Sequence, residues 1–91
     1  MIEAVYDKDA LTLTVTGHAD YAPYGQDVVC AGVSTLVYTL INSCPCEIIG
    51  ETVRVKDDRR LYDAIICGLE MISAQFPKNL RVVPYRTDVR A

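Results

Sequence analysis

A long apolar period in the first half of the chain constrains its fold most strongly. The run from Val28 predicts a helix with one buried face, because its apolar residues recur at spacings of three and four. Asp27 is a favourable N-cap, since its carboxylate can accept hydrogen bonds from backbone N–H groups of the first turn, and Pro45 stops the run. The residues of the apolar face are Val33, Leu36, Val37, Leu40, Ile41 and Cys44.

Alternating segments on both sides of this helix predict a sheet. Apolar and hydroxyl residues alternate over 11–16, and residues 2–7 supply a hairpin partner. Residues 52–56 alternate in the same way, and apolar residues over 61–76 repeat at helical spacing. Residues 80–85 predict a last strand, at a sheet edge because of Pro84. The prediction is a single domain over residues 1–91, an α+β two-layer sandwich of order ββαβαβ with two helices packed on a four-stranded sheet.

Composition limits the classes of function. A chain of 91 residues with 51% hydrophobic content is predicted to fold rather than stay disordered. Its net charge of −3 argues against direct binding of nucleic acid, which requires neutralisation of phosphates by Lys and Arg. No apolar stretch is long enough to cross a bilayer, and the first residues lack the regions of a signal peptide, so we expect a cytoplasmic protein without a membrane partner.

Cys30 is the candidate nucleophile. It is predicted to lie in the first turn of the helix, where unpaired N–H groups and the positive end of the dipole favour a thiolate. The only histidine, His18, directly follows a predicted strand and could serve as the base. A packed structural cysteine and a solvated loop histidine are the alternatives, and residue chemistry alone leaves them open.

Residues around this pair have candidate supporting roles. Ser34 lies one turn beyond Cys30, where it could help orient the site or bond to the carbonyl four residues earlier. The backbone N–H groups of Cys30 and Ala31 could hold an oxyanion if they are free in the first turn. Asp27 could cap the helix or direct its charge toward His18.

The segment 18–27 is predicted to be an exposed loop, because it holds turn residues and no sustained period. Within 19–26, Tyr21 and Tyr24 are candidates for contacting an apolar peptide as part of a lid. Tyr38 and Tyr62, each on a predicted helix, are expected to pack on the body of the domain.

The remaining cysteines carry no predicted chemistry. Cys44-Pro45-Cys46 is C-x-C rather than the C-x-x-C of common zinc and redox motifs. Cys44 and Cys67 are expected to pack within their helices. In a cytoplasmic protein all four cysteines should stay reduced.

The candidate residues together resemble a known family. Gly17-His18-Ala19, then a loop, then Asp27-Val28-Val29-Cys30-Ala31 and Ser34 are similar to the signature of the ribosomal-processing cysteine proteases of bacteria, and the likeness covers nearly the whole chain. The resemblance implies that Cys30 is the nucleophile and His18 its base, with Asp27 and Ser34 in the same pattern. It also implies a homodimer without metal or cofactor.

The activity implied by the resemblance is that of a cysteine endopeptidase. Its partner would be the precursor of a large-subunit ribosomal protein, from which it would remove a short N-terminal extension through an acyl-enzyme. Two other classes of function stay open: a non-catalytic ribosome-associated assembly or binding protein, and a thiol redox sensor that uses Cys30. No third catalytic group is evident.

Overall fold

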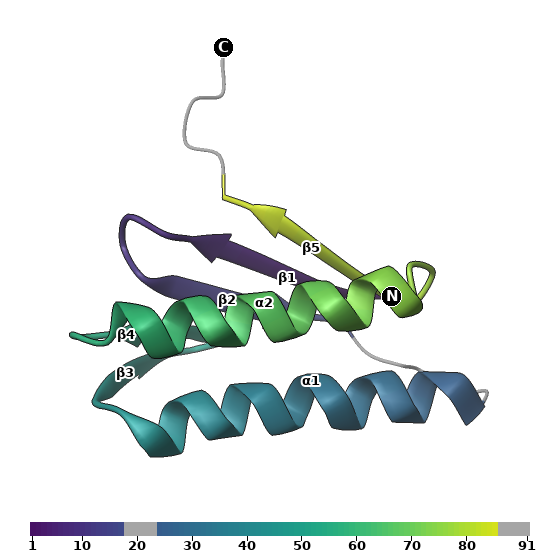
Figure 1. The fold of residues 1–91 in the computed structure, drawn as a ribbon, viewed down its shortest axis with the longest axis horizontal. Helices are drawn as coiled ribbons and strands as arrows, with labels where there is room; N and C mark the ends of the chain where they lie inside the picture. Colours follow the sequence, from purple (N-terminus) through teal and green to yellow (C-terminus); the bar gives the residue numbers. More distant parts are fainter. Residues whose placement is uncertain (18–23, 86–91) are drawn as a thin grey trace, which may run out of the picture.

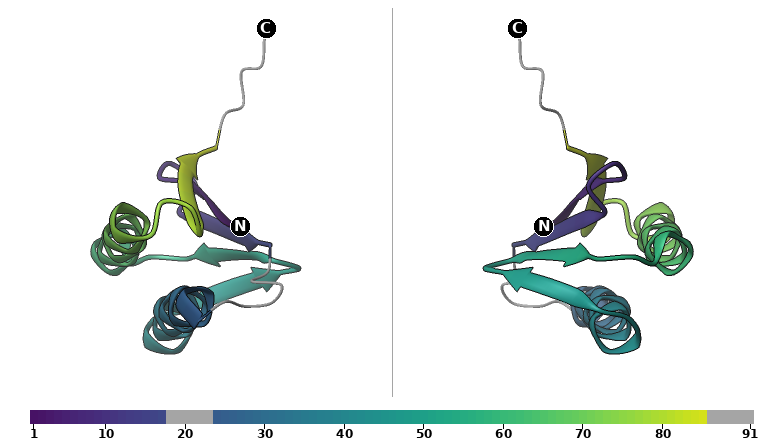
Figure 2. Two further views of the ribbon diagram at one scale, coloured as in Figure 1. Left: turned by 90° about the vertical axis from the view of Figure 1, so that its right-hand side faces the viewer. Right: turned by 90° about the vertical axis from the view of Figure 1, so that its left-hand side faces the viewer.

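The structure, a computed structural model, describes residues 1–17 and 24–85, without the side chains of 24–27. Two helices lie side by side over one face of a twisted sheet (Figures 1 and 2). The elements in chain order are β1 (Ile2–Asp7), β2 (Thr12–Thr16), α1 (Tyr24–Ser43), β3 (Cys46–Ile49), β4 (Thr52–Val55), α2 (Arg59–Gln75) and β5 (Leu80–Pro84).

The sheet has five strands in the order β3-β4-β2-β1-β5. The β1/β2, β2/β4 and β3/β4 pairs are antiparallel, and β5 pairs in parallel with β1. The predicted α+β sandwich is confirmed, and β5 lies at an edge, as Pro84 requires. The predicted count of four strands was wrong, because β3 was missed.

The missed strand β3 is short and carries little pattern. Its four residues follow α1 after only two others, and Ile48 and Ile49 at its end are both exposed. A half-buried strand is recognised by alternation, which four residues without a buried member do not show. The turn to β4 depends on Gly50, whose φ of 60° lies in the left-handed region that favours glycine.

Close packing between the two helices fixes α1 against the body of the domain. Leu36 of α1 lies over Gly68 of α2, and Ile72 of α2 lies over Gly32 of α1. An added Cβ would come within 3.0 Å of Leu36 Cδ1 at Gly68 and within 3.1 Å of Ile72 Cδ1 at Gly32. The absence of a side chain at these two glycines therefore lets α1 and α2 lie close together.

Helix α2 is anchored at its first turn. The side chain of Asp58 caps it by accepting from the N–H of Leu61 at 3.0 Å. Tyr62 is fully buried, and its hydroxyl donates to the carbonyl oxygen of Thr12 at 2.6 Å. Burial raises the pKa of Tyr62 to about 12. The packing predicted for Tyr62 is confirmed.

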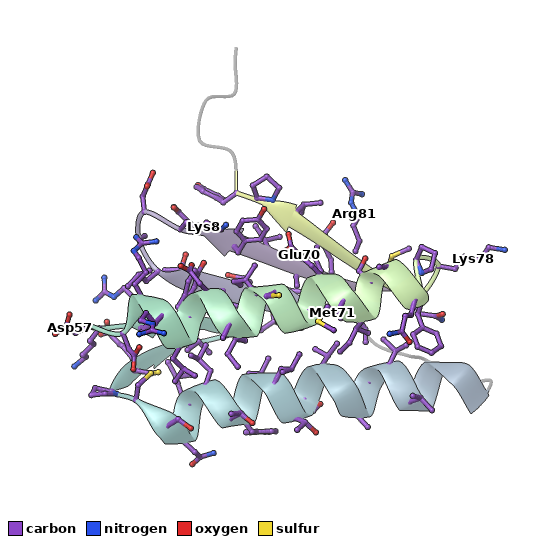
Figure 3. All side chains as sticks on the ribbon, in the orientation of Figure 1. Lys8, Asp57, Glu70, Met71, Lys78 and Arg81 are labelled. Carbon is purple, nitrogen blue, oxygen red and sulfur yellow. The ribbon has the colours of Figure 1, made fainter. Side chains whose placement is uncertain are left out.

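The two ends of α2 lie at opposite ends of the domain, marked by Asp57 before the helix and Lys78 after it (Figure 3). Within the described residues, no helix is long and apolar enough to span a membrane.

Candidate active site

Cys30 lies on α1, half-buried and packed against the edge of the core. The helix begins at Tyr24, so Cys30 is in its second turn and the prediction of a first-turn position with Asp27 as N-cap was wrong. Residues 24–27 are helical although none of them belongs to the repeating apolar face of α1, so the apolar pattern does not reveal the first turn. Since each helical N–H donates to the carbonyl four residues earlier, the N–H groups of Cys30 and Ala31 belong to the helix ladder. The oxyanion role predicted for them loses its basis.

Gly17 ends the described segment before His18, and its conformation is strongly constrained. Its φ is 93°, a value that L side chains rarely adopt. A Cβ at Gly17 would overlap the carbonyl oxygen of Met1 and lie 3.2 Å from the Cα of Ile2. Glycine is therefore required where the chain leaves β2 toward His18.

Several predicted site residues lie wholly or partly outside the described part of the chain. His18 and Tyr21 fall in 18–23, outside the described residues. Tyr24 and Asp27 are described as backbone of α1 only, which corrects the prediction that the loop continues to residue 27.

An apolar groove of about 380 Å³ lies between α1 and the sheet. The helix supplies one wall, and β2, β4 and the β3–β4 hairpin supply the other. The residues of the helical wall are Val33, Ser34, Val37, Tyr38 and Ile41, and those of the opposite wall are Leu13, Val15, Ile48, Gly50, Glu51 and Val53. Cys30 is three residues before Val33 and four before Ser34, so it lies on the same side of α1, one turn from this groove.

Ser34 is exposed and lines the groove, on the helix face predicted for it. Its hydroxyl does not bond to the carbonyl of Cys30, and it has no hydrogen-bond partner among the described residues. Bonds of that kind are made instead by Thr35 to Ala31 at 2.8 Å and by Thr39 to Thr35 at 2.7 Å. The Ser34 hydroxyl is therefore available to another molecule. Ala31 is exposed one turn before Thr35.

Two predictions about packing were wrong. Tyr38 is 63% exposed and lines the groove instead of packing in the core, because it lies two residues before the buried Leu40 and so off the buried face of α1. Cys67 is exposed, because it lies two residues from both Ile65 and Leu69 and points away from the buried face of α2.

The sequence analysis also missed the strand wall of the groove. Ile48 and Glu51 belong to the β3–β4 hairpin, and their contribution depends on a strand that the pattern did not indicate. The adjacent isoleucines before Gly50 were the available signal. Among the described side chains, no three His, Cys, Asp or Glu residues converge as metal ligands would.

A partly exposed thiol on a helix, one turn from an apolar groove, is an arrangement compatible with an enzyme that uses a cysteine nucleophile. In a comparison with protein families, the family model of the cysteine protease Prp matches residues 1–81 of the chain. The chain belongs to the cysteine protease Prp family. The predicted family and the predicted cysteine protease class are thereby confirmed.

Individual relatives agree with this assignment. The ribosomal processing cysteine protease Prp of Bacillus subtilis is 33% identical, over 89% of this chain and 91% of its own length. Prp from S. aureus, solved with a covalently linked product peptide, superposes with a TM-score of 0.69 at 21% identity over 92% of this chain and 97% of that one. A second structure of S. aureus Prp, with a substrate peptide, gives a TM-score of 0.70 at 17% identity and the same coverage. These superpositions show the shared fold.

Proposed function

We propose that this chain is an endopeptidase that removes a short N-terminal extension from the precursor of a large-subunit ribosomal protein. The observation that carries the proposal is the apolar groove one helical turn from Cys30. Apolar walls suit an extended peptide with apolar side chains, and the free hydroxyl of Ser34 supplies a polar contact. The name of the B. subtilis relative, a ribosomal processing protease, supports the substrate class.

Cys30 is the proposed nucleophile. Its Sγ would attack the carbonyl carbon of the scissile bond, expel the new N-terminal amine and leave a thioester, which water then hydrolyses. Its partial exposure supports this role, because a fully packed thiol could not reach a substrate. The covalently linked product peptide in S. aureus Prp is in keeping with a nucleophilic mechanism in the family.

His18 is the proposed base and acid. Val15 of β2 lines the groove, and β2 ends at Thr16, so the chain passes from the groove wall through Gly17 to His18. Cys30 lies just before Val33 of the opposite wall, and this topology supports a meeting of the two residues at one end of the groove. His18 would take the thiol proton and later give a proton to the leaving amine.

The other proposed roles are accessory. Ser34 would hydrogen-bond the backbone of the bound peptide, and Tyr21 and Tyr24 would contact its apolar side chains. Asp27 would orient His18 through its charge.

Self-association and a cytoplasmic location complete the proposal. A domain of 91 residues buries a limited fraction of its surface, and β3 exposes Ile48 and Ile49 at the sheet edge, which supports a homodimer. Ribosomal precursors are made in the cytoplasm, so a processing enzyme would work there. Sedimentation equilibrium would test the dimer, and fractionation of cells would test the location.

The experiment that tests the function is incubation of the chain with the full-length ribosomal precursor, followed by mass analysis. We expect one cut that releases the extension, loss of cutting in Cys30→Ala, and retained cutting in the matched control Cys67→Ala, which changes an exposed thiol on α2. Binding of the precursor without a cut would instead identify a non-catalytic assembly protein. Oxidation of Cys30 without a cut would identify a redox sensor.

A further inference from the structure

Two cysteines meet at the corner where α1 ends and β3 begins. Cys44 follows the last residue of α1, Cys46 is the first residue of β3, and Pro45 lies between them. Their Sγ atoms are 3.6 Å apart, and both thiols are free and half-buried. The corner is separate from Cys30, because fourteen helical residues at a rise of 1.5 Å amount to roughly 20 Å.

The main chain of α1 keeps the two sulfurs together. Cys44 Sγ lies 3.5 Å and Cys46 Sγ lies 3.7 Å from the same acceptor, the carbonyl oxygen of the fully buried Leu40. A shared acceptor directs both thiols to one side of the corner. Since the S–S bond of a disulfide is about 2.05 Å, closure needs an approach of roughly 1.5 Å, which rotation about the Cα–Cβ bonds of two partly exposed side chains can supply.

The surroundings also divide the roles of the two thiols. Burial, the contact with Cys46, and the charges of Cys46 and Asp58 raise the pKa of Cys44 to about 11. Cys44 therefore holds its proton more firmly than an ordinary thiol does. Because the thiolate is the attacking species in thiol–disulfide exchange, the raised pKa makes Cys44 a slow first attacker.

We propose that Cys44 and Cys46 are a redox-active dithiol that closes to an intrachain disulfide when it meets a low-molecular-weight disulfide such as oxidised glutathione. The Cys46 thiolate attacks one sulfur of that disulfide, forms a mixed disulfide and releases one thiolate. Cys44 then loses its proton and attacks Cys46 Sγ, which expels the second thiolate. The protein loses two electrons and two protons, and the small disulfide is reduced to two thiols.

The test uses the full chain with Cys30→Ser and Cys67→Ser, which leaves Cys44 and Cys46 as its cysteines. After incubation with oxidised glutathione and quenching by acid, we expect an intact mass lower by two hydrogens and no remaining reaction with an alkylating reagent. The matched controls, with Cys44→Ser or Cys46→Ser added, should instead gain one glutathione. A stable glutathione adduct on the chain that has both cysteines, or two thiols that stay unreacted, would overturn the proposal.

A second measurement separates the folded geometry from the proximity of the two cysteines along the chain. In concentrated urea both the contact through Leu40 and the burial that raises the pKa of Cys44 are lost, so the rate of closure should differ from that of the folded chain. Equal rates in the folded and unfolded chain would show that the fold contributes nothing. If the doubly substituted chain does not fold, the unsubstituted chain is oxidised and cut after Leu40 and Arg54, and the same disulfide is sought within that peptide.

Discussion

Replacement of Gly17 by alanine should destabilise the protein more than replacement of Gly50, although both glycines have positive φ. For Gly50→Ala we expect the free energy of unfolding to fall by about 1 kcal/mol, the usual cost of placing a side chain on a residue in a left-handed conformation. Its added Cβ would meet no atom within 4 Å. Gly50 therefore serves as a control for backbone conformation alone.

At Gly17 the same conformational cost is joined by a collision with the Met1 carbonyl oxygen, which is backbone and cannot rotate away. Moving it disturbs the start of β1, where the N–H of Ile2 donates to Asn79 at 2.9 Å and the side chain of Ile2 is 3% exposed. A weakened hydrogen bond and a displaced core residue each cost about 1 kcal/mol. Gly17→Ala should therefore lower the free energy of unfolding by about 3 kcal/mol, which is about 2 kcal/mol more than the control Gly50→Ala.

Urea unfolding of the two variants, followed by circular dichroism, measures this difference. A domain with a typical unfolding free energy of about 5 to 15 kcal/mol should stay folded with either change, so peptide cleavage can be measured on both. Because Gly17 directly precedes His18, a displacement near 1 Å should lower kcat/KM by about 100-fold in Gly17→Ala. Equal unfolding free energies for the two variants would refute the argument from the Met1 carbonyl, whatever the cleavage rate.

Four further outcomes follow from the structure. His18→Ala should lower kcat by orders of magnitude and change the pH dependence of Cys30 alkylation; an unchanged alkylation profile would show that the two residues do not interact. Tyr62→Phe should lower the free energy of unfolding in urea by about 1 to 2 kcal/mol, because the partly buried carbonyl of Thr12 loses its donor, and full stability would contradict that bond. Since folding raises the pKa of Tyr62 from 10 to about 12, its contribution to stability is complete below pH 10 and is lost toward pH 12. The free energy of unfolding should therefore fall less steeply across this pH range in Tyr62→Phe than in the unsubstituted chain. The raised pKa of Cys44 gives a decrease in the same direction in both proteins. Tyr38→Ala should raise KM for the precursor peptide and leave the unfolding free energy within about 0.5 kcal/mol, and an unchanged KM would remove Tyr38 from the substrate groove.

The sequence by itself determined the elements whose burial is periodic. β1 was predicted at its observed bounds, β2 and β4 within one residue, and the apolar face of α1 holds the buried Val33 and Leu40. These predictions succeed because burial of one face imposes a period of 2 or 3.6 residues that the order of apolar residues in the sequence displays. The family followed from a short motif around Cys30, which is also a local property of the chain, and the role of Cys30 as nucleophile stays a prediction.

The tertiary structure decided what depends on contacts between distant segments. The groove joins Val15, Val37 and Ile48 from three elements, and the strand that carries Ile48 has too few residues to show a period. The need for glycine at position 17 comes from Met1, and the contact of Cys44 with Cys46 comes from the turn of the chain around Leu40. A period tells which face of an element is buried, but it does not tell what lies against that face, because the partner is chosen by the packing of the whole chain.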